Sequence, residues 1–178
     1  LGLPRPGAAA SLPPMRRTDL AFSALTIGTA ASIATLLAFV FLRVPVAQPE
    51  AGGLAQKIFY FHVPAAYAMY LSGVVCGVAS GAYLARPTTE RDALAHAAAE
   101  TAVVFGAMVL VSGPLWARKA WGVYWTWDPR LTSYLMLWLI YLSYLVLRGY
   151  VPDPERRAKF SAVLGIVAAA CGGDGGGD

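Results

Sequence analysis

Charged residues are scarce in this sequence. Asp, Glu, Lys and Arg make up only 13% of its 178 residues, whereas hydrophobic residues make up 57%. An ordinary soluble domain carries about 25% charged residues, so the composition argues against that class. Several apolar runs reach the ~20 residues that a helix needs to cross a bilayer. The composition therefore predicts an all-α protein, a polytopic membrane helix bundle.

Cysteine and histidine are rare as well, with two residues of each. Neither CxxC nor CxxCH occurs, which excludes a thioredoxin-like redox pair and a covalent c-type haem attachment within this chain. We expect Cys76 to pack in the middle of a span as a small apolar residue. The sequence also lacks a nucleophile elbow, a P-loop, HExxH and a dinucleotide fingerprint, so it does not support a hydrolase or a nucleotide-driven pump.

Four apolar segments are long enough to be full membrane spans. We expect these spans at Leu20 to Leu42, Pro64 to Leu84, Ala93 to Leu115 and Leu131 to Leu147. The segment from Phe160 to Ala170 is too short to cross and is interpreted as a partial fifth span.

The ends of the chain differ in composition from the spans. Residues 1–14 are rich in Pro, Gly and Ala, and we expect them to be a disordered extension. Residues 171–178 consist of Cys, Gly and Asp, and we expect a low-complexity tail outside the fold. The remaining residues, 15–170, are predicted to form one transmembrane domain.

Helix-start signals precede three of the spans. Pro64 suits the first turn of the second span, where its missing N–H costs nothing. Thr88 and Thr89 are candidate N-caps of the third span. Asp128 and Pro129 are typical of an N-cap and a first helical position, so we expect the fourth span to begin there and Asp128 to serve structure before chemistry.

The basic residues are divided unequally between the two sides of the predicted bundle. The N-terminus and the second and fourth loops hold nine: Arg5, Arg16, Arg17, Arg86, Arg91, Arg148, Arg156, Arg157 and Lys159. The first and third loops hold five: Arg43, Lys57, Arg118, Lys119 and Arg130. Because cytoplasmic loops carry the excess of Lys and Arg, the N-terminus is predicted to be cytoplasmic. The first and third loops then share the outer face.

Residues 116–130 form a predicted outer-face loop that is rich in tryptophan, just after a helix end or kink expected at Gly113-Pro114. Three of the five Trp residues lie in residues 121–130, and Trp116 lies just upstream. An aromatic belt is one explanation, because Trp anchors membrane interfaces. Belt residues would be spread over every helix end, however. The clustering favours a platform for a flat apolar ligand.

His62 precedes the second span and is predicted to lie on the same face as the Trp-rich loop. Two interpretations stay open, an interfacial structural residue or a metal or haem-iron ligand. Arg118, Lys119 and Arg130 flank the loop and are either topological charges or partners for ligand carboxylates. An apolar shelf with a cationic rim and a histidine matches haem, which carries two propionates.

Two further groups of residues share a helix face. His96 and Glu100 lie four residues apart, but no third ligand accompanies them, so we do not expect a metal site. Tyr134, Trp138 and Tyr141 share a face of the fourth span, where packing is the default explanation and an extension of the platform the alternative.

The stretch WGVYWTWDPRLTS resembles the WWD signature of the haem-handling proteins of cytochrome c biogenesis. The segment KIFYFHVPAAYAMYL resembles the first-loop motif of the haem exporter protein C family within that group. Together the likeness covers residues 15–170. It implies a six-span protein of the bacterial inner (plasma) membrane that binds haem b at the periplasmic face and transfers it to a periplasmic haem chaperone, without being an enzyme.

The resemblance also implies partners and site residues. The partners are the chaperone, a small single-span accessory subunit, the ABC transporter subunits of the same system and membrane lipid, with no nucleic acid. His62 would be one axial ligand of the haem iron, and a second axial histidine is expected beyond the end of this chain. The residues expected around the haem are Trp121, Tyr124, Trp125, Trp127 and Asp128, with Arg118 and Arg130. The alternative is a fragment of a related haem lyase or cytochrome c synthesis protein that attaches haem to apocytochrome.

Overall fold

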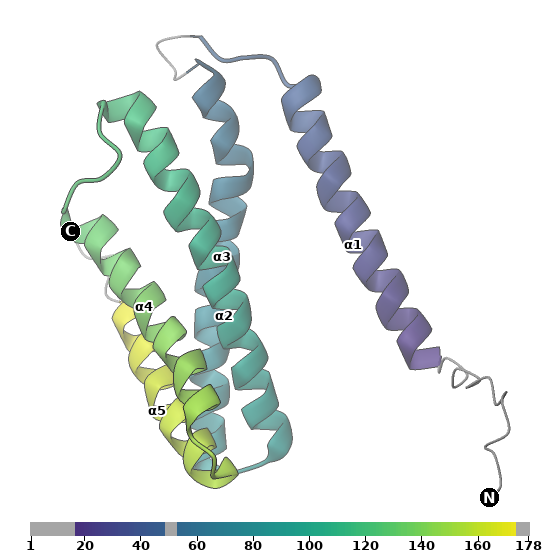
Figure 1. Ribbon diagram of the computed structural model, residues 1–178, viewed down its shortest axis with the longest axis vertical. Coiled ribbons are helices and arrows are strands. Elements are labelled where there is room, and N and C mark those ends of the chain that lie inside the picture. Colours follow the sequence, from purple (N-terminus) through teal and green to yellow (C-terminus); the bar gives the residue numbers. More distant parts are fainter. Residues whose placement is uncertain (1–16, 49–52, 174–178) are drawn as a thin grey trace, which may run out of the picture. The chain divides into compact units, whose positions relative to one another are not determined.

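The computed structural model describes residues 17–48 and 53–173, and every element within them is a helix (Figure 1). In chain order they are α1 (Arg17–Leu42), the short 3₁₀ helix η2 (Gly53–Ile58), α2 (Phe59–Ala85), α3 (Thr89–Trp121), α4 (Pro129–Tyr150) and α5 (Pro154–Gly173). The extension predicted at residues 1–14 lies outside the described residues. Helix α5 includes residues 171–173, so the predicted tail begins within a helix.

The prediction of four spans and a fifth helix is confirmed. Four helical segments in the described part of the chain are long and apolar enough to cross a membrane: Thr18–Leu42, Gly53–Ala85, Thr89–Trp121 and Pro129–Tyr150. Helix α5 is longer than the expected segment 160–170, because its charged first turns are helical too. The chain is therefore a multi-pass membrane protein.

The chain divides into two compact units, residues 1–45 and 46–178. Helix α1 in the first unit exposes nearly all of its side chains, and most of them are apolar. A helix that is apolar all round suits a lipid environment. The hydroxyls of Thr26, Ser32 and Thr35 donate to carbonyls four residues earlier, so these polar groups are satisfied within the helix.

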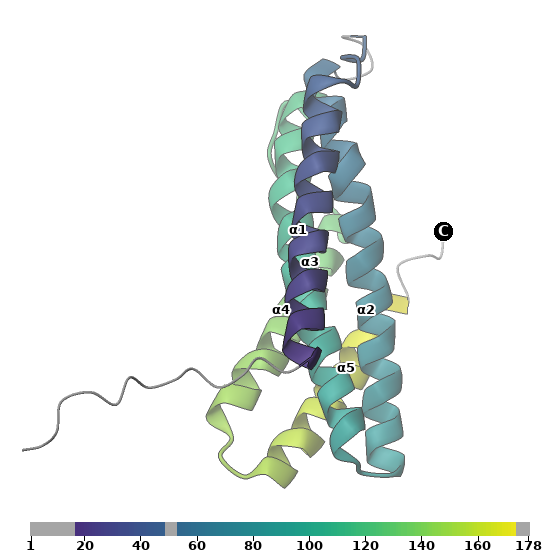
Figure 2. The same ribbon diagram turned by 90° about the vertical axis from the view of Figure 1, so that its right-hand side faces the viewer.

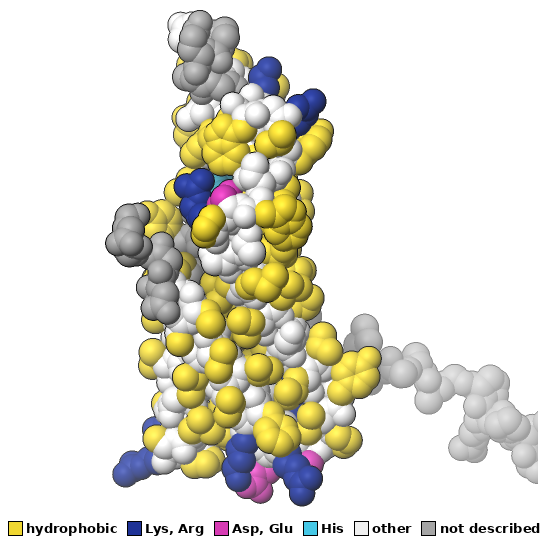
Figure 3. All heavy atoms as spheres, turned by 90° about the vertical axis from the view of Figure 1, so that its left-hand side faces the viewer, with side chains coloured by type: hydrophobic (Ala, Val, Ile, Leu, Met, Phe, Trp, Pro, Cys, Tyr) yellow, Lys and Arg dark blue, Asp and Glu magenta, His cyan; other side chains and the backbone are white. Residues whose placement is uncertain are grey.

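The second unit is a bundle in which α2 packs against α3 and α5, and α4 packs against α3 and α5 (Figures 1 and 2). Its core contains Met69, Cys76, Ala99, Tyr141 and Tyr144, all nearly inaccessible. The placement of Cys76 confirms the expected packing role. One face of this unit is largely hydrophobic between Lys and Arg side chains at its two ends (Figure 3), as expected for a protein that crosses a bilayer.

Glycines and alanines let the helices of the bundle approach closely. A Cβ on Gly77 of α2 would lie 2.4 Å from the Cβ of Ala169 in α5. A Cβ on Gly106 of α3 would lie 2.5 Å from the Trp138 ring of α4, whose Nε1 donates to the Val103 carbonyl at 2.9 Å. Small residues at such crossings are typical of membrane helix bundles, where close van der Waals contact drives association.

Two expected helix boundaries are wrong. Helix α2 begins at Phe59, so Pro64 lies inside the helix and not in its first turn. Helix α3 continues through Pro114 to Trp121, so residues 116–121 are helical. It ends at Gly122, whose φ of 80° is the left-handed conformation that favours glycine, and whose N–H donates to the Arg118 carbonyl at 3.2 Å. This glycine stop, and not the proline, ends the helix.

Two expected helix caps are confirmed. The Thr88 hydroxyl accepts from the Arg91 N–H at the start of α3. At the start of α4, Asp128 accepts from the Leu131 N–H at 3.0 Å and Pro129 occupies the first helical turn.

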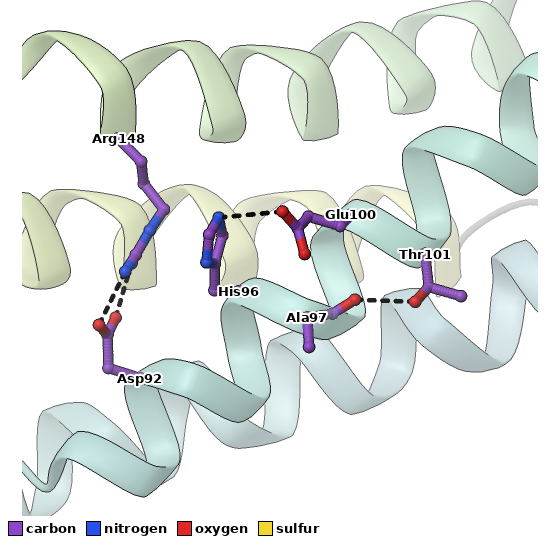
Figure 4. A network of polar contacts seen from close by, with 6 residues as sticks. All are labelled: Asp92, His96, Ala97, Glu100, Thr101 and Arg148. Carbon is purple, nitrogen blue, oxygen red and sulfur yellow. Dashed lines mark hydrogen bonds and ion pairs between the residues drawn. The ribbon is translucent and has the colours of Figure 1, made fainter. Parts of the chain in front are cut away.

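An ion pair joins α3 to α4 at the end of the bundle opposite the tryptophans (Figure 4). The Arg148 guanidinium donates to both carboxylate oxygens of Asp92, at 2.6 and 2.8 Å. His96 and Glu100 lie beside this pair on α3 with 3.7 Å between Nε2 and Oε1. We call this end, where α2 and α4 finish and α3 and α5 begin, the basic end.

Candidate functional site

A cavity of about 420 Å³ lies at the other end of the bundle, which we call the aromatic end. Its walls come from the start of α2, the last turns of α3, the connection to α4 and the first turns of α4. The lining residues are Ile58, Phe59, His62, Ala66, Val109, Leu110, Gly113, Pro114, Trp116, Ala117, Trp121, Tyr124, Trp125, Arg130, Leu131 and Tyr134. Volume and apolar lining are typical of a small-molecule or cofactor site, for which roughly 300–1,000 Å³ is usual.

His62 forms part of the α2 wall, one turn into the helix. Its Nδ1 lies 2.7 Å from the hydroxyl oxygen of Ser112 on α3, and that hydroxyl donates to the Met108 carbonyl at 2.6 Å. A Cβ on Gly113 would lie 3.3 Å from the imidazole Cε1. The ring is thus held against one turn of α3, and Nε2 is the ring nitrogen left for a ligand.

Aromatic side chains near the start of α2 and the end of α3 form part of the cavity wall through edge-to-face contacts. The rings of Phe59 and Trp116 are 5.2 Å apart, and those of Trp116 and Trp121 are 5.4 Å apart. These geometries are the preferred ones for aromatic pairs, so the wall is a packed unit and not a set of independent rings. The Trp125 Nε1 is buried and has no hydrogen-bond partner among the described residues, which leaves a donor for a bound molecule.

Only part of the predicted contact set lines the cavity. Trp121, Tyr124, Trp125 and Arg130 do, together with His62. Trp127 does not, since its side chain is 75% exposed and rests against Trp125 with the ring centroids 5.7 Å apart.

Arg118 and Asp128 serve the connection between α3 and α4. Arg118 donates to the Gly122 carbonyl and lies over the Tyr124 ring, 5.6 Å from its centroid. Asp128 accepts from the Leu131 N–H and from the Thr126 hydroxyl, and these bonds hold the pKa of its carboxyl below the usual range. Both residues shape the segment that carries Tyr124 and Trp125. Of the described residues that line the cavity, Arg130 is the one with a positive charge.

Sequence reasoning missed several wall residues. Trp116 belongs to the predicted loop 116–130 and Phe59 was not singled out, whereas both are helical and line the cavity. Tyr134 lines it as well, so the expected face of α4 divides: Tyr134 extends the site, while Trp138 and Tyr141 pack in the core. The contact from His62 to Ser112 joins residues 50 positions apart, so no local sequence pattern predicts it.

Comparison with known proteins assigns the chain to a family. The family model described as Heme exporter protein C matches residues 11–171. The heme exporter protein C of Bradyrhizobium diazoefficiens is 42% identical over 118 residues, which is 66% of this chain and 44% of that protein. The one of Rhodobacter capsulatus is 37% identical over 143 residues, or 79% and 58%. The one of Paracoccus denitrificans is 34% identical over 157 residues, or 87% and 63%.

The match to cytochrome c synthesis proteins is shorter. A cytochrome c biogenesis protein CcsA from a Synechococcus strain is 46% identical, but over 61 residues that make up 34% of this chain and 20% of that protein. The chain spans about half the length of the curated relatives named above. The family model, by contrast, covers nearly all of the chain. It includes the segment around His62 and the Trp-rich segment, both of which line the cavity. The chain therefore belongs to the heme exporter protein C family.

Proposed function

We propose that this chain binds haem in the cavity at its aromatic end and delivers it to a periplasmic haem chaperone for cytochrome c biogenesis. The observation that carries the proposal is that one cavity gathers His62, Trp125 and Arg130 from three separate elements. Family membership supports the choice of haem as cargo, since the relatives are named heme exporters.

The walls match the chemistry of a haem. Imidazole nitrogen is a common axial ligand of haem iron, and His62 keeps Nε2 for it. The edge-to-face rings of Phe59, Trp116 and Trp121 offer apolar surface to a macrocycle. The Arg130 guanidinium and the unpartnered Trp125 N–H are donors suited to a propionate. A b-type haem suits these non-covalent contacts.

The proposed role is to hold and release cargo. Among the lining residues, none is placed as a nucleophile next to a general base, the arrangement that bond-making would need. Within the described part of the chain, the lining residues would supply one iron ligand, apolar walls and one positive charge, that of Arg130. A carrier subunit therefore fits better than an enzyme.

Sidedness follows from charge. Arg86, Arg91, Arg148, Arg156 and Arg157 lie at or near the basic end, so we place that end and the N-terminus in the cytoplasm of a bacterial inner membrane. The aromatic end then faces the periplasm. Partners of the proposed reaction are the chaperone, which would meet the exposed Trp127, and the accessory and ABC transporter subunits of the maturation system.

The test compares residues that line the cavity with matched residues that do not. We expect His62→Ala and Trp125→Ala to lose most of the Soret absorbance of the protein purified from haem-replete membranes. His96→Ala changes the other histidine of the chain, at the basic end, and Trp127→Ala removes an exposed ring; both should keep most of the haem. Wild-type haem content in the His62→Ala/Trp125→Ala double variant, or equal losses in the two histidine variants, would contradict the proposal.

A further inference from the structure

The contact between His62 and Ser112 joins two neighbouring helices that both line the cavity. His62 lies on α2 and Ser112 on α3, and the distance from Nδ1 to Oγ is 2.7 Å. Ser112 is only 5% exposed, so water does not readily take its place beside the imidazole. Such a contact constrains the orientation of the imidazole directly.

The direction of the hydrogen bonds follows from counting protons. A serine hydroxyl has one proton, and at 2.6 Å that of Ser112 goes to the Met108 carbonyl, which can only accept. The Ser112 oxygen therefore meets His62 with a lone pair. Nδ1 must then carry the proton, and Nε2 of the neutral ring keeps its lone pair. Backbone carbonyl, serine and histidine form a chain that selects one tautomer.

Back-bonding by a serine to the preceding turn is common and has no function by itself. Thr101 and Ser143 form the same kind of bond, to the Ala97 and Leu139 carbonyls at 2.8 Å. In the hydrogen bonds between described residues, Ser112 is distinguished because its hydroxyl also meets an imidazole. Here the ordinary bond to Met108 uses the hydroxyl proton, so the Ser112 oxygen can only accept from His62. The contact with His62 is what sets Ser112 apart from the other residues that form such bonds.

A second residue of α3, Gly113, lies beside the imidazole ring. Its lack of a side chain leaves room for the ring, since a Cβ at this position would lie 3.3 Å from Cε1, which is tighter than usual carbon contacts. Residues Ser112 and Gly113 thus present a hydroxyl and a gap side by side to the same ring. The dipeptide matches the imidazole in both polarity and shape.

We propose that Ser112 is a positioning residue that holds His62 in the Nδ1–H tautomer with Nε2 available as a ligand atom. The tautomer itself does not depend on haem. Its use as an axial ligand rests on the proposed function, because histidines that bind metals commonly donate their other N–H to an oxygen that orients the ring.

The tautomer can be measured without haem. The chain has only two histidines, so ¹⁵N-histidine labelling gives two imidazole spectra, and His96→Gln assigns them. At about pH 8, above the usual histidine pKa of ~6.5, we expect His62 to show a protonated Nδ1 and an unprotonated Nε2. In Ser112→Ala we expect the Nε2–H form, which neutral imidazole prefers in water, to become populated. Ser143→Ala, which removes a back-bond without an imidazole, should leave the spectrum unchanged.

The second measurement concerns haem. We expect Ser112→Ala to weaken haem binding about 10- to 100-fold, the usual effect of losing a residue that orients a metal ligand. The reduction potential of the haem bound to this variant should rise, because an imidazole whose Nδ1–H has lost its hydrogen bond donates less electron density to ferric iron. Ser112→Cys keeps the shape and a weak acceptor, so its haem affinity and reduction potential should lie between those of Ser112→Ala and the wild type. Ser143→Ala should match the wild type in both.

The outcomes separate the two proposals. Wild-type protein that binds no haem, with an Nδ1–H tautomer that Ser112→Ala abolishes, would refute the proposed function and leave the positioning role of Ser112 intact. A wild-type protein that binds haem through His62, with the tautomer and reduction potential unchanged in both Ser112 variants, would overturn the positioning role. If Ser112→Ala does not fold, Ser112→Cys decides between these results by the same spectra.

Discussion

The ion pair between Asp92 and Arg148 allows a direct test of how burial changes the strength of a salt bridge. Its shorter N–O distance is 2.6 Å, and the side chains are 22% and 11% exposed. Glu155 and Lys159 form a pair with the same distance, but their side chains are 72% and 52% exposed. The chain thus holds two pairs that match in length and differ in burial and in span: one joins α3 to α4, and the other lies within α5. We would replace each residue by Ala, singly and together.

The expected magnitude follows from the contacts of Arg148. It makes two charge-assisted hydrogen bonds to Asp92, and its guanidinium lies 5.9 Å from the centre of the Tyr144 ring. Breaking a fully buried pair costs about 3–5 kcal/mol, whereas exposed pairs contribute roughly 0–1 kcal/mol. Since water still reaches part of this pair, we expect Asp92→Ala to lower the free energy of unfolding by about 2–3 kcal/mol, with a coupling energy of about 2 kcal/mol between the two residues.

Equilibrium unfolding in mixed detergent micelles, followed by tryptophan fluorescence, gives these values. The coupling between Glu155 and Lys159 should be much smaller and should fall further in high salt, because solvent screens exposed charges. Equal coupling energies for the two pairs would refute the reasoning, since burial would then not decide their strength. A coupling near zero for Asp92 and Arg148 would show that the ion pair does not help to hold α3 and α4 together, and that apolar packing and the Trp138–Val103 hydrogen bond do so.

Three further predictions concern glycines and a helix cap. Gly106→Ala should lower the unfolding free energy by about 1–3 kcal/mol, because its Cβ would meet Trp138 at 2.5 Å and Met69 Sδ at 2.9 Å; Gly149→Ala, with open space around it, should be neutral or stabilising in the same unfolding assay. Gly113→Ala should reduce haem content while unfolding like the wild type, since its Cβ would crowd the His62 ring by a few tenths of an ångström; unchanged Soret absorbance would contradict it. The Asp128 pKa is lower in the folded than in the unfolded chain, mainly through the Leu131 N–H, so its stabilisation is present above the unfolded value of about 3.9 and is lost as the pH falls through the folded one. Unfolding measured against pH should therefore show an advantage of wild type over Asp128→Ala at neutral pH that disappears in this acid range.

The spans and caps could be predicted because they depend on local properties. Apolar runs of sufficient length identified four spans, and the start of α4 followed from the pair Asp128-Pro129 alone. The end of α3 could not be predicted in the same way. A proline normally suggests a break, because it removes one backbone hydrogen bond of the helix. Beyond Pro114, however, Trp116 packs against Phe59 and Trp121, and these contacts favour a helix that continues to Trp121.

The candidate site was predicted in its main residues and not in their arrangement. Residue types and charge bias placed His62 on the same face as the tryptophans, and the cavity contains both. Trp125 lines the cavity and Trp127 is exposed beside it, a difference that depends on the backbone of the connection between α3 and α4 and not on residue type. The pairing of His62 with Ser112 depends on the register between two helices, which composition and periodicity do not determine.

The lengths of α2 and α3 determine the depth of the cavity. Each helical segment, Gly53–Ala85 and Thr89–Trp121, has 33 residues. At ~1.5 Å per residue this is about 50 Å, although about 20 residues suffice for a hydrocarbon core of ~30 Å. About 20 residues counted from the basic end reach residue 65 on α2 and residue 109 on α3. The residues of both helices that line the cavity lie almost entirely in the excess length. A molecule bound there lies towards the aromatic end of the two helices, away from the charged first turns of α3.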